Sequence, residues 1–276
     1  MVFTNAMRAI AHKELSDKLK SRWVLVIAVG FAALTIVISY FGGATAGVAG
    51  FRSIDATIAS LTSLVTYFIP ILALTLGGGI VADERDKGTL EIYLSSPISI
   101  GEFIMGKFFG LAIALAISTL VGLGVSGAIL LINLGFGAIG SYSIFMLNSV
   151  VLGLIFLSVS FLVSILFNER ARVIAFTVFL WLFFAVLYDL GLVGLLIITK
   201  GTVGNEIFST LLTLNPVDVY RILNFLSIGE LKVFLGLASV ELPSYMKTPV
   251  LWVISLLWVV LPLIASYRLF KRRYLA

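Results

Sequence analysis

A run of 61 residues, positions 108–168, contains no Asp, Glu, Lys or Arg. A helix that crosses the hydrocarbon core of a membrane needs about 20 mostly apolar residues, so this run is too long for one span and fits two. Three glycines lie near its middle, at Gly135, Gly137 and Gly140. We therefore predict two membrane-spanning helices with a break near residues 133–143.

Four further segments have the length of a membrane span and carry at most one charged residue. They cover residues 23–42, 58–81, 173–199 and 248–267. The composition agrees, because 12% of all residues are charged whereas soluble domains carry about 25%. The sequence predicts an all-α integral membrane protein with six transmembrane helices and both termini on one side.

Lysine and arginine are distributed unequally between the two sides of this predicted bundle. Fourteen of the 19 flank the membrane on the side of the termini, and five lie on the other side. Since short cytoplasmic segments carry the excess of positive charge, we predict cytoplasmic termini. Residues 83–100 then lie on the cytoplasmic face and residues 200–248 on the outer face, within one transmembrane domain that covers residues 1–276.

The N-terminal segment, residues 1–22, has the pattern of an amphipathic helix. Four apolar residues recur at intervals of four, at Met7, Ala11, Leu15 and Leu19, with basic residues between them. This pattern predicts a helix on the inner membrane surface whose cations face anionic lipid headgroups. An ordinary soluble amphipathic helix is the alternative, and the adjacent membrane span favours the interfacial one.

The link between the second and third predicted spans is the most densely charged part of the chain. Five charged residues occupy positions 83–87, and a short helix is predicted at residues 88–94, with Glu91 on its polar side. Its apolar side carries Leu90, Tyr93 and Leu94. The link could be a plain solvated loop, but an acidic cluster beside an apolar face favours contact with another protein.

A capping box at Ser99 and Glu102 predicts that the third span begins near Ile100. The residues that follow, GEFIMGK, match the phosphate-binding pattern G-x-x-x-x-G-K. A helix that starts this early uses the N–H groups a phosphate would need, and Phe108 replaces the Ser or Thr that holds Mg²⁺. We predict no ATP site in this chain, and a Lys107 side chain that reaches to the inner membrane surface.

Asp189 lies near the middle of the fifth predicted span. A charge there costs about 2.5–3.5 kcal/mol on insertion scales, so such a residue normally faces a pore or a partner. One interpretation places Asp189 at a dimer interface or transport route. The other gives it a hydrogen bond to Ser, Thr, Tyr or backbone on a neighbouring helix. The sequence leaves both open.

The stretch LNPVDVYRIL, residues 214–223, predicts the start of a helix on the outer side. Asn215 is the expected N-cap and Pro216 the first helical residue. Asp218 and Arg221 are three residues apart and can pair. A capped external helix is the simplest interpretation, and a docking surface for another protein is the alternative.

Metal binding and hydrolysis have little support in the sequence. The chain has no cysteine and a single histidine, His12, on the cytoplasmic side, and its five methionines are too sparse for a Cu(I) relay. An intramembrane hydrolase needs a nucleophile with a base, or a metal, and no H-E-x-x-H occurs. A channel or secondary carrier usually shows more intramembrane polar groups or an internal repeat. We predict a non-catalytic protein with no cofactor or metal of its own.

The segment ERDKGTLEIYLSSPISIGEFIMGK resembles the cytoplasmic link of ABC-2 type transporter permeases. The pattern E-x-x-x-G-T-L-E-x-L-L-x-x-P, followed by G-K, is matched at Glu84, Gly88, Thr89, Leu90, Glu91, Leu94, Pro97, Gly106 and Lys107. Four other blocks, KELSDKLKSRW, ATIASLTSL, YDL and LNPVDVYRIL, are similar to the subfamily that serves maturation of nitrous oxide reductase. The similarity spans nearly the whole chain, and its departures lie mainly in the cytoplasmic link.

The resemblance implies a permease of the cell (inner) membrane that forms a homodimer and carries two separate ATPase subunits, which bind ATP and Mg²⁺. The short helix of the link would be the coupling helix. The subfamily further implies a periplasmic β-helical copper-handling partner and a role in copper-site assembly of nitrous oxide reductase. An export permease for an unrelated drug, lipid or ion is the alternative. Nucleic acid is not among the expected partners.

The resemblance also implies roles for two groups of residues. The coupling residues would be Glu84, Arg85, Gly88, Thr89, Leu90, Glu91, Tyr93 and Leu94. The residues that dock the extracytoplasmic partner would be Asn215, Pro216, Asp218, Tyr220 and Arg221.

Overall fold

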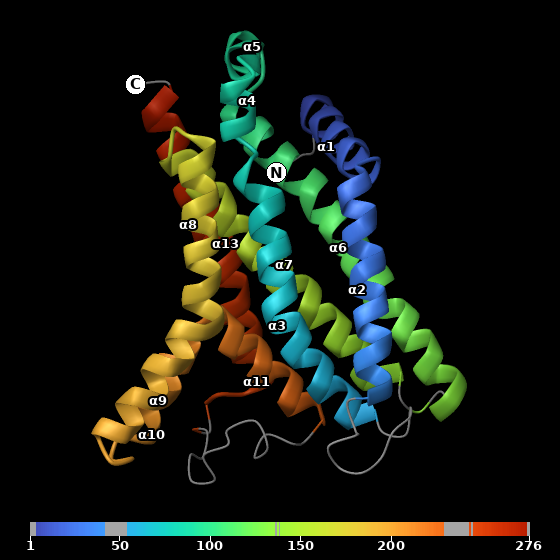
Figure 1. Cartoon of the computed structure of the whole chain (residues 1–276). Coiled ribbons are helices and arrows are strands. Elements are labelled where there is room, and N and C mark those ends of the chain that lie inside the picture. The colour runs from blue at the N-terminus through green and yellow to red at the C-terminus, as the bar shows by residue number, and fades with distance from the viewer. Residues whose placement is uncertain are drawn as a thin grey trace.

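The computed structural model describes residues 4–41, 54–135, 137, 139–228, 243 and 245–274, with the backbone alone over residues 22–28. All regular structure within these ranges is helical (Figure 1). The long helices are α2 (Arg22–Phe41), α3 (Ile54–Gly78), α6 (Ile100–Leu134), α7 (Ile139–Leu166) and α13 (Thr248–Tyr274). A further rod consists of α8 (Arg170–Leu182), the π-helical turn η3 (Phe183–Leu187) and α9 (Tyr188–Ile198).

Five helical segments of the described chain are long and apolar enough to cross a membrane. They contain α3, α6, α7, the α8–α9 rod and α13. The first predicted span corresponds to α2, whose apolar described part is Val29–Phe41. The structure confirms an all-helical, multi-span chain over the described residues, while the count of six spans and the orientation of the termini stay predictions.

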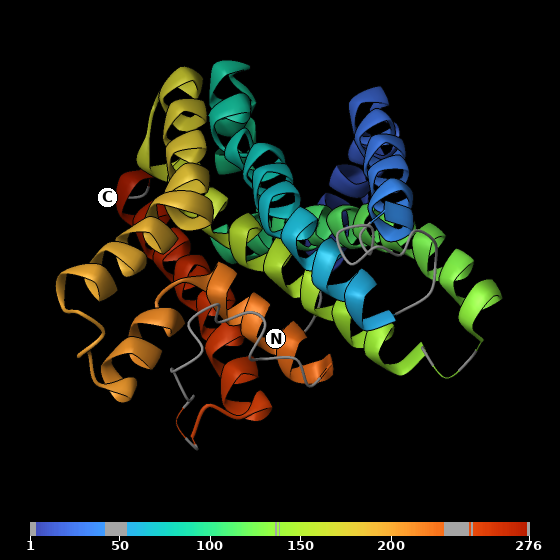
Figure 2. The ribbon, with the colours of Figure 1, turned by 60° about the horizontal axis from the view of Figure 1, so that its bottom comes forward.

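The long helices lie in two layers. In one layer α3 lies between α8 and α2, and in the layer behind it α7 lies between α13 and α6 (Figures 1 and 2). The core therefore forms around α3 and α7. Several serines of α7 are fully buried, and those at Ser149, Ser158 and Ser160 donate to carbonyls of their own helix at 2.7–2.8 Å. Small side chains of this kind let membrane helices pack closely without leaving a polar group unpaired.

In its described residues, the segment predicted to lie outside the membrane contains the helices α10 (Asn205–Thr213) and α11 (Pro216–Ile228). Both are at the lower end of Figure 1, opposite α4 and α5. The shorter of the two, α10, has contacts with α11, and α11 packs against α3, α7 and α13. Buried hydrogen bonds hold α11 to α7, from Asn148 Nδ2 to Asn224 Oδ1 at 2.7 Å and between the hydroxyls of Ser149 and Tyr220 at 3.1 Å. The helix α11 therefore packs as part of the bundle, and its location on the outer side stays a prediction.

The N-terminal helix α1 (Asn5–Leu19) packs along the first turns of α6. Its buried residues are Met7, Ile10 and Glu14, whereas Leu19 is 41% exposed, so the predicted stripe of every fourth residue only partly matches the buried face. Two glycines of α6 allow the close approach. A Cβ atom at Gly110 would lie 2.5 Å from Ala11 O of α1, closer than real Cβ contacts come. The position of α1 on a membrane surface stays a prediction.

Candidate functional site

Two short helices, α4 (Ala82–Asp86) and α5 (Thr89–Ser95), project beyond the long helices at the top of Figure 1. We call residues 82–95 the α4–α5 knob. Gly88 joins the two helices with a φ of 68°, a left-handed conformation that glycine adopts without steric cost. The predicted coupling helix at residues 88–94 is α5, one residue later at each end. The third span begins at Ile100 as predicted, with both hydrogen bonds of the capping box present.

The knob is fastened to the bundle at the start of α4. The backbone N–H groups of Val81 and Ala82 donate to Ser164 Oγ of α7 at 3.0 and 3.3 Å. The Thr89 hydroxyl at the start of α5 donates to Glu84 O at 3.2 Å and to the Glu84 carboxylate. A serine of a core helix therefore caps α4, and a threonine ties α5 to α4. Without Ser164, the N–H groups of Val81 and Ala82 at the start of α4 would lose their acceptor.

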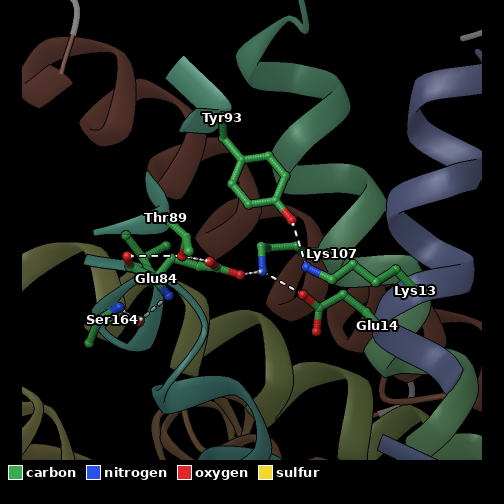
Figure 3. Close-up of polar contacts among 9 residues, drawn as sticks. Lys13, Glu14, Glu84, Thr89, Tyr93, Lys107 and Ser164 are labelled. Atoms are coloured by element: carbon green, nitrogen blue, oxygen red, sulfur yellow. Dashed lines mark hydrogen bonds and ion pairs between the residues drawn. The ribbon is translucent and has the colours of Figure 1, made fainter. Parts of the chain in front are cut away.

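The amine of Lys107, on α6, is the centre of a buried ionic cluster (Figure 3). Its Nζ donates to Glu84 Oε1 of α4 at 2.7 Å and to Glu14 Oε1 of α1. The Lys107 side chain is 2% exposed, and those of Glu14 and Glu84 are 10% and 13% exposed. Since water is largely excluded, each charge depends on the others for compensation. We call Lys107, Glu14 and Glu84 the Lys107 cluster.

Two aromatic rings cover the Lys107 amine. Its Nζ lies 5.6 Å from the ring centroid of Tyr93 on α5 and 5.4 Å from that of Phe103 on α6. The ring centroids of Tyr93 and Phe103 are 5.0 Å apart. A cation this close to a ring face is attracted by the ring electrons. The amine therefore has contacts from α1, α4, α5 and α6.

The buried position of Lys107 corrects the prediction that its side chain reaches to the membrane surface. That prediction used only the charge and its place near the end of a span. The structure adds α1, which covers this side of α6 and supplies Glu14 as a partner. The sequence carries no local signal for this pairing, because Glu14 and Lys107 are 93 residues apart.

A second polar contact joins α1 to the knob next to the cluster. Lys13 Nζ donates to the Tyr93 hydroxyl at 3.1 Å (Figure 3). This hydrogen bond raises the pKa of Lys13 above its ordinary value of 10.5. Lys13 is therefore protonated at neutral pH and holds the ring of Tyr93 against the bundle.

Arg85 fastens the other side of the knob to α7 and α13. Its Nη1 donates to the carbonyl oxygens of Phe167 and Asn168 at 3.0 and 2.8 Å, and its Nη2 donates to the Tyr274 hydroxyl. The carbonyls at the end of α7 lack helical partners, so a guanidinium there is favourable. Arg85, predicted as a coupling residue, thus has its contacts inside the chain.

The apolar side of α5 faces the bundle, which changes the predicted contact surface. Leu90 is 4% exposed in the core, and Tyr93 packs on Phe103. The exposed apolar residues of the knob are Ile92, at 64%, and Leu94, at 37%, and Glu91 is exposed beside them. Ile92 is not among the predicted coupling residues, because it lies off the i, i+3, i+4 stripe. An apolar residue on the polar side of a helix was the available signal.

A second charged cluster lies where α9 and α11 meet. Arg221 Nη1 of α11 donates to Asp189 of α9, and to Asp218 Oδ1 at 3.2 Å. Asp218 is 2% exposed, and the side chains of Arg221 and Asp189 are 14% and 32% exposed. We call these three residues the Arg221 cluster. The sequence pairs Asp218 with Arg221 but does not show that Asp189 joins them.

Asn215, the residue just before α11, connects the Arg221 cluster to the π-helical turn η3 of the α8–α9 rod. Asn215 Nδ2 donates to Phe184 O in that turn at 3.0 Å and to Asp218 Oδ2 at 3.0 Å. Asn215 Oδ1 accepts from the N–H of Val217 at 3.0 Å, so Asn215 caps α11 as predicted. The first turns of α11 are therefore joined to the rod at Phe184 in η3 and at Asp189 in α9.

The predicted docking residues are turned into the bundle. Asn215, Pro216, Asp218 and Tyr220 are buried, and the Arg221 side chain is 14% exposed. They contribute little surface to a partner in this conformation, so the docking role stays a prediction. In the described ranges no three His, Cys, Asp or Glu side chains come together as a metal site.

Comparison with known proteins settles the family. Residues 8–275 match the family described as ABC-2 family transporter protein. The chain belongs to the ABC-2 transporter family. It is 35% identical over 273 residues to a probable ABC transporter permease protein NosY of Stutzerimonas stutzeri, covering 98% of this chain and 99% of the relative. It is 36% identical over 269 residues to a probable ABC transporter permease protein NosY of Pseudomonas aeruginosa, covering 96% of this chain and 97% of the relative.

Family membership and the long apolar helices together make the chain a multi-pass membrane permease. ABC-2 permeases are membrane subunits, in agreement with the prediction of a non-catalytic protein. The resemblance to the NosY subfamily, inferred from short blocks, is confirmed over nearly the full length. The coupling and docking roles of individual residues stay predictions.

Proposed function

We propose that this chain is the membrane subunit of an ATP-driven transporter, and that the α4–α5 knob is its contact with a separate ATPase. Two copies of the permease would pair in the inner membrane with two ATPase subunits, each of which binds ATP and Mg²⁺. Movement of the ATPase pair would then tilt the helices through the knob. The termini and the knob would face the cytoplasm.

One observation carries this proposal. The knob is fastened to the bundle by bonds to Ser164 and Lys107 and by its own Arg85, which donates to Asn168 O, yet it exposes Ile92 and Leu94. A well-fixed element that exposes apolar side chains outside a membrane has the properties of a protein contact. An open groove lies beside it, lined by residues that include Leu94, Ile98 and Phe270.

Affinity purification with the variant Ile92→Glu tests the contact. We expect the wild-type chain to be recovered with a bound ATPase, measured by ATP hydrolysis of the purified complex, and Ile92→Glu to lose it. The matched control is Leu19→Glu, because Leu19 is an exposed apolar residue of α1 outside the knob. A wild-type chain without any ATPase, or an Ile92→Glu variant that keeps it, contradicts the proposal.

The similarity to NosY permeases supports a more specific role. We propose that the transporter serves copper-site assembly of nitrous oxide reductase together with a periplasmic β-helical protein. The sparse soft ligands of this chain favour a subunit that drives a partner or moves another species over one that binds copper itself. Mass spectrometry of the purified complex tests this role. Recovery of the ATPase without a β-helical partner would favour the alternative, export of an unrelated drug, lipid or ion.

A further inference from the structure

The Lys107 cluster connects α1 to the knob, and contact with an ATPase does not by itself require this connection. The knob follows α3 and precedes α6 in the chain, and these neighbours could hold it alone. Instead Glu14 reaches Lys107 from α1, and the adjacent Lys13 donates to Tyr93 of α5. Two successive residues of α1 therefore contact α6 and the knob.

The helix α1 packs closely against α6. A Cβ atom at Gly106 would lie 2.9 Å from Ile10 Cβ, and one at Gly110 would lie 2.5 Å from Ala11 O. Backbones this close cannot slide past each other without separating first. Lys20 and Ser21 alone separate α1 from α2. A displacement of α1 therefore reaches the first long helix directly.

The charges make Lys107 the group on which the connection depends. One ammonium lies between two carboxylates, and all three side chains are at most 13% exposed. With the ammonium removed, Glu14 and Glu84 would face each other in a region of low dielectric and repel. Repulsion between these two residues separates α1 from α4, the helix that begins the knob.

Resting on the proposed ATPase contact, we propose that Lys107 is a positioning residue of the transport cycle. It joins the knob to α1 and α6, so that movement of the knob is passed to α1–α2 and α6 as one body. The ion pair with Glu14 connects Lys107 to α1, and the ion pair with Glu84 connects it to the knob. The consequence is that α1 belongs to the moving unit and does more than anchor the chain to lipid.

Distances between spin labels test the connection, since the chain has no cysteine and accepts labels only where cysteines are introduced. One label pair, at Asp17→Cys on α1 and Lys87→Cys on the knob, uses exposed positions. We expect a narrow distance distribution in the otherwise unchanged chain and in Lys107→Arg. The variant Glu14→Gln removes the negative charge that α1 contributes and leaves Lys107 paired with Glu84. In this variant the distance distribution should broaden. Glu169→Gln, at a surface pair 60% exposed, is the matched control and should stay narrow.

A second pair tests the role in the cycle. Labels at Asp17→Cys and at Arg172→Cys, an exposed residue of α8, report movement of α1 relative to the bundle. With the ATPase bound, a non-hydrolysable ATP analogue should shift this distance, and Glu14→Gln should lose the shift at unchanged ATPase recovery. If the Glu14–Lys107 pair only stabilised the fold, Glu14→Gln would leave the nucleotide-dependent shift in place in a complex that still contains its ATPase.

The outcomes separate this inference from the proposed function. A Glu14→Gln variant with a narrow first distribution and an intact shift overturns the role of Lys107, whatever the ATPase does. Absence of a bound ATPase from the wild-type chain overturns the proposed function, and the first label pair still reports whether α1 and the knob are connected. A broadened first distribution with an intact shift also counts against the inference, because α1 would then move without the connection.

Discussion

Replacing Arg221 with methionine should be among the most destabilising single changes in this chain. The substitution keeps much of the apolar stem and removes the only cation of the Arg221 cluster. Asp218, 2% exposed, and Asp189, with a side chain 32% exposed, then remain as neighbouring carboxylates without a counter-charge. Removing one partner of a buried ion pair costs about 3–5 kcal/mol. Because Asp189 is partly exposed to solvent, we expect a cost near the lower end, about 3 kcal/mol.

The variant Asp189→Asn should cost much less, although it changes a residue in the middle of a span. Arg221 would keep Asp218 as a partner at 3.2 Å, and the asparagine can still accept a hydrogen bond. We expect about 1 kcal/mol, the value of one hydrogen bond to a charged group reduced to a neutral one. A larger loss of stability in Arg221→Met than in Asp189→Asn would show that the cluster needs a compensating cation more than it needs the carboxylate of Asp189.

Thermal unfolding of the detergent-solubilised chain, followed by the fluorescence of its four tryptophans, measures this order. Arg172→Met is the control, because the Arg172 side chain is 67% exposed and its pair with Glu169 lies at the surface. A change there should stay within about 0.5 kcal/mol. The reasoning is refuted if Arg221→Met unfolds at the same temperature as Arg172→Met, or if Asp189→Asn lowers the unfolding temperature as much as Arg221→Met.

Three further substitutions test local features by the same unfolding measurement. Gly88→Ala should cost roughly 1–2 kcal/mol, because its φ of 68° is left-handed, and Gly88→Asn should cost less since asparagine tolerates that region; equal effects would exclude backbone strain. Ser164→Ala should cost about 1–3 kcal/mol by leaving the N–H groups of Val81 and Ala82 without their acceptor, and an unchanged midpoint would mean that α4 finds another cap. Gly110→Leu should release α1 from α6, seen as faster proteolysis within α1, whereas an unchanged rate would show that the close approach is not required.

Features that depend on neighbouring residues in the chain were predicted well. The capping box at Ser99 and Glu102 placed the start of α6 at Ile100, and Asn215 caps α11. The short helix predicted at residues 88–94 begins and ends one residue later in the structure, as α5. The π-helical turn η3 was not predicted, because no local pattern in residues 183–187 distinguishes it from α-helix.

Features that depend on which helices meet were predicted poorly. Asp189 was expected to line a dimer interface or transport route, or to have a hydrogen bond to Ser, Thr, Tyr or backbone. The structure gives it an ion pair with Arg221 on α11, which neither interpretation named. The apolar stripe of α5 was expected to face a partner, and Leu90 instead joins the core of the chain itself. A sequence shows that an apolar face or a charge must be covered, and it does not show by which element.

The sequence by itself determined that this chain is a helical membrane protein, because apolar length and the distribution of charge are local properties that the membrane selects. It also determined where individual helices begin, since caps act within one turn. The tertiary structure alone decided that Lys107 is buried between Glu14 and Glu84, and that Arg221 compensates two aspartates. A charge is buried only where distant helices bring its counter-charges together, and that meeting is set by packing between helices and not by spacing along the chain.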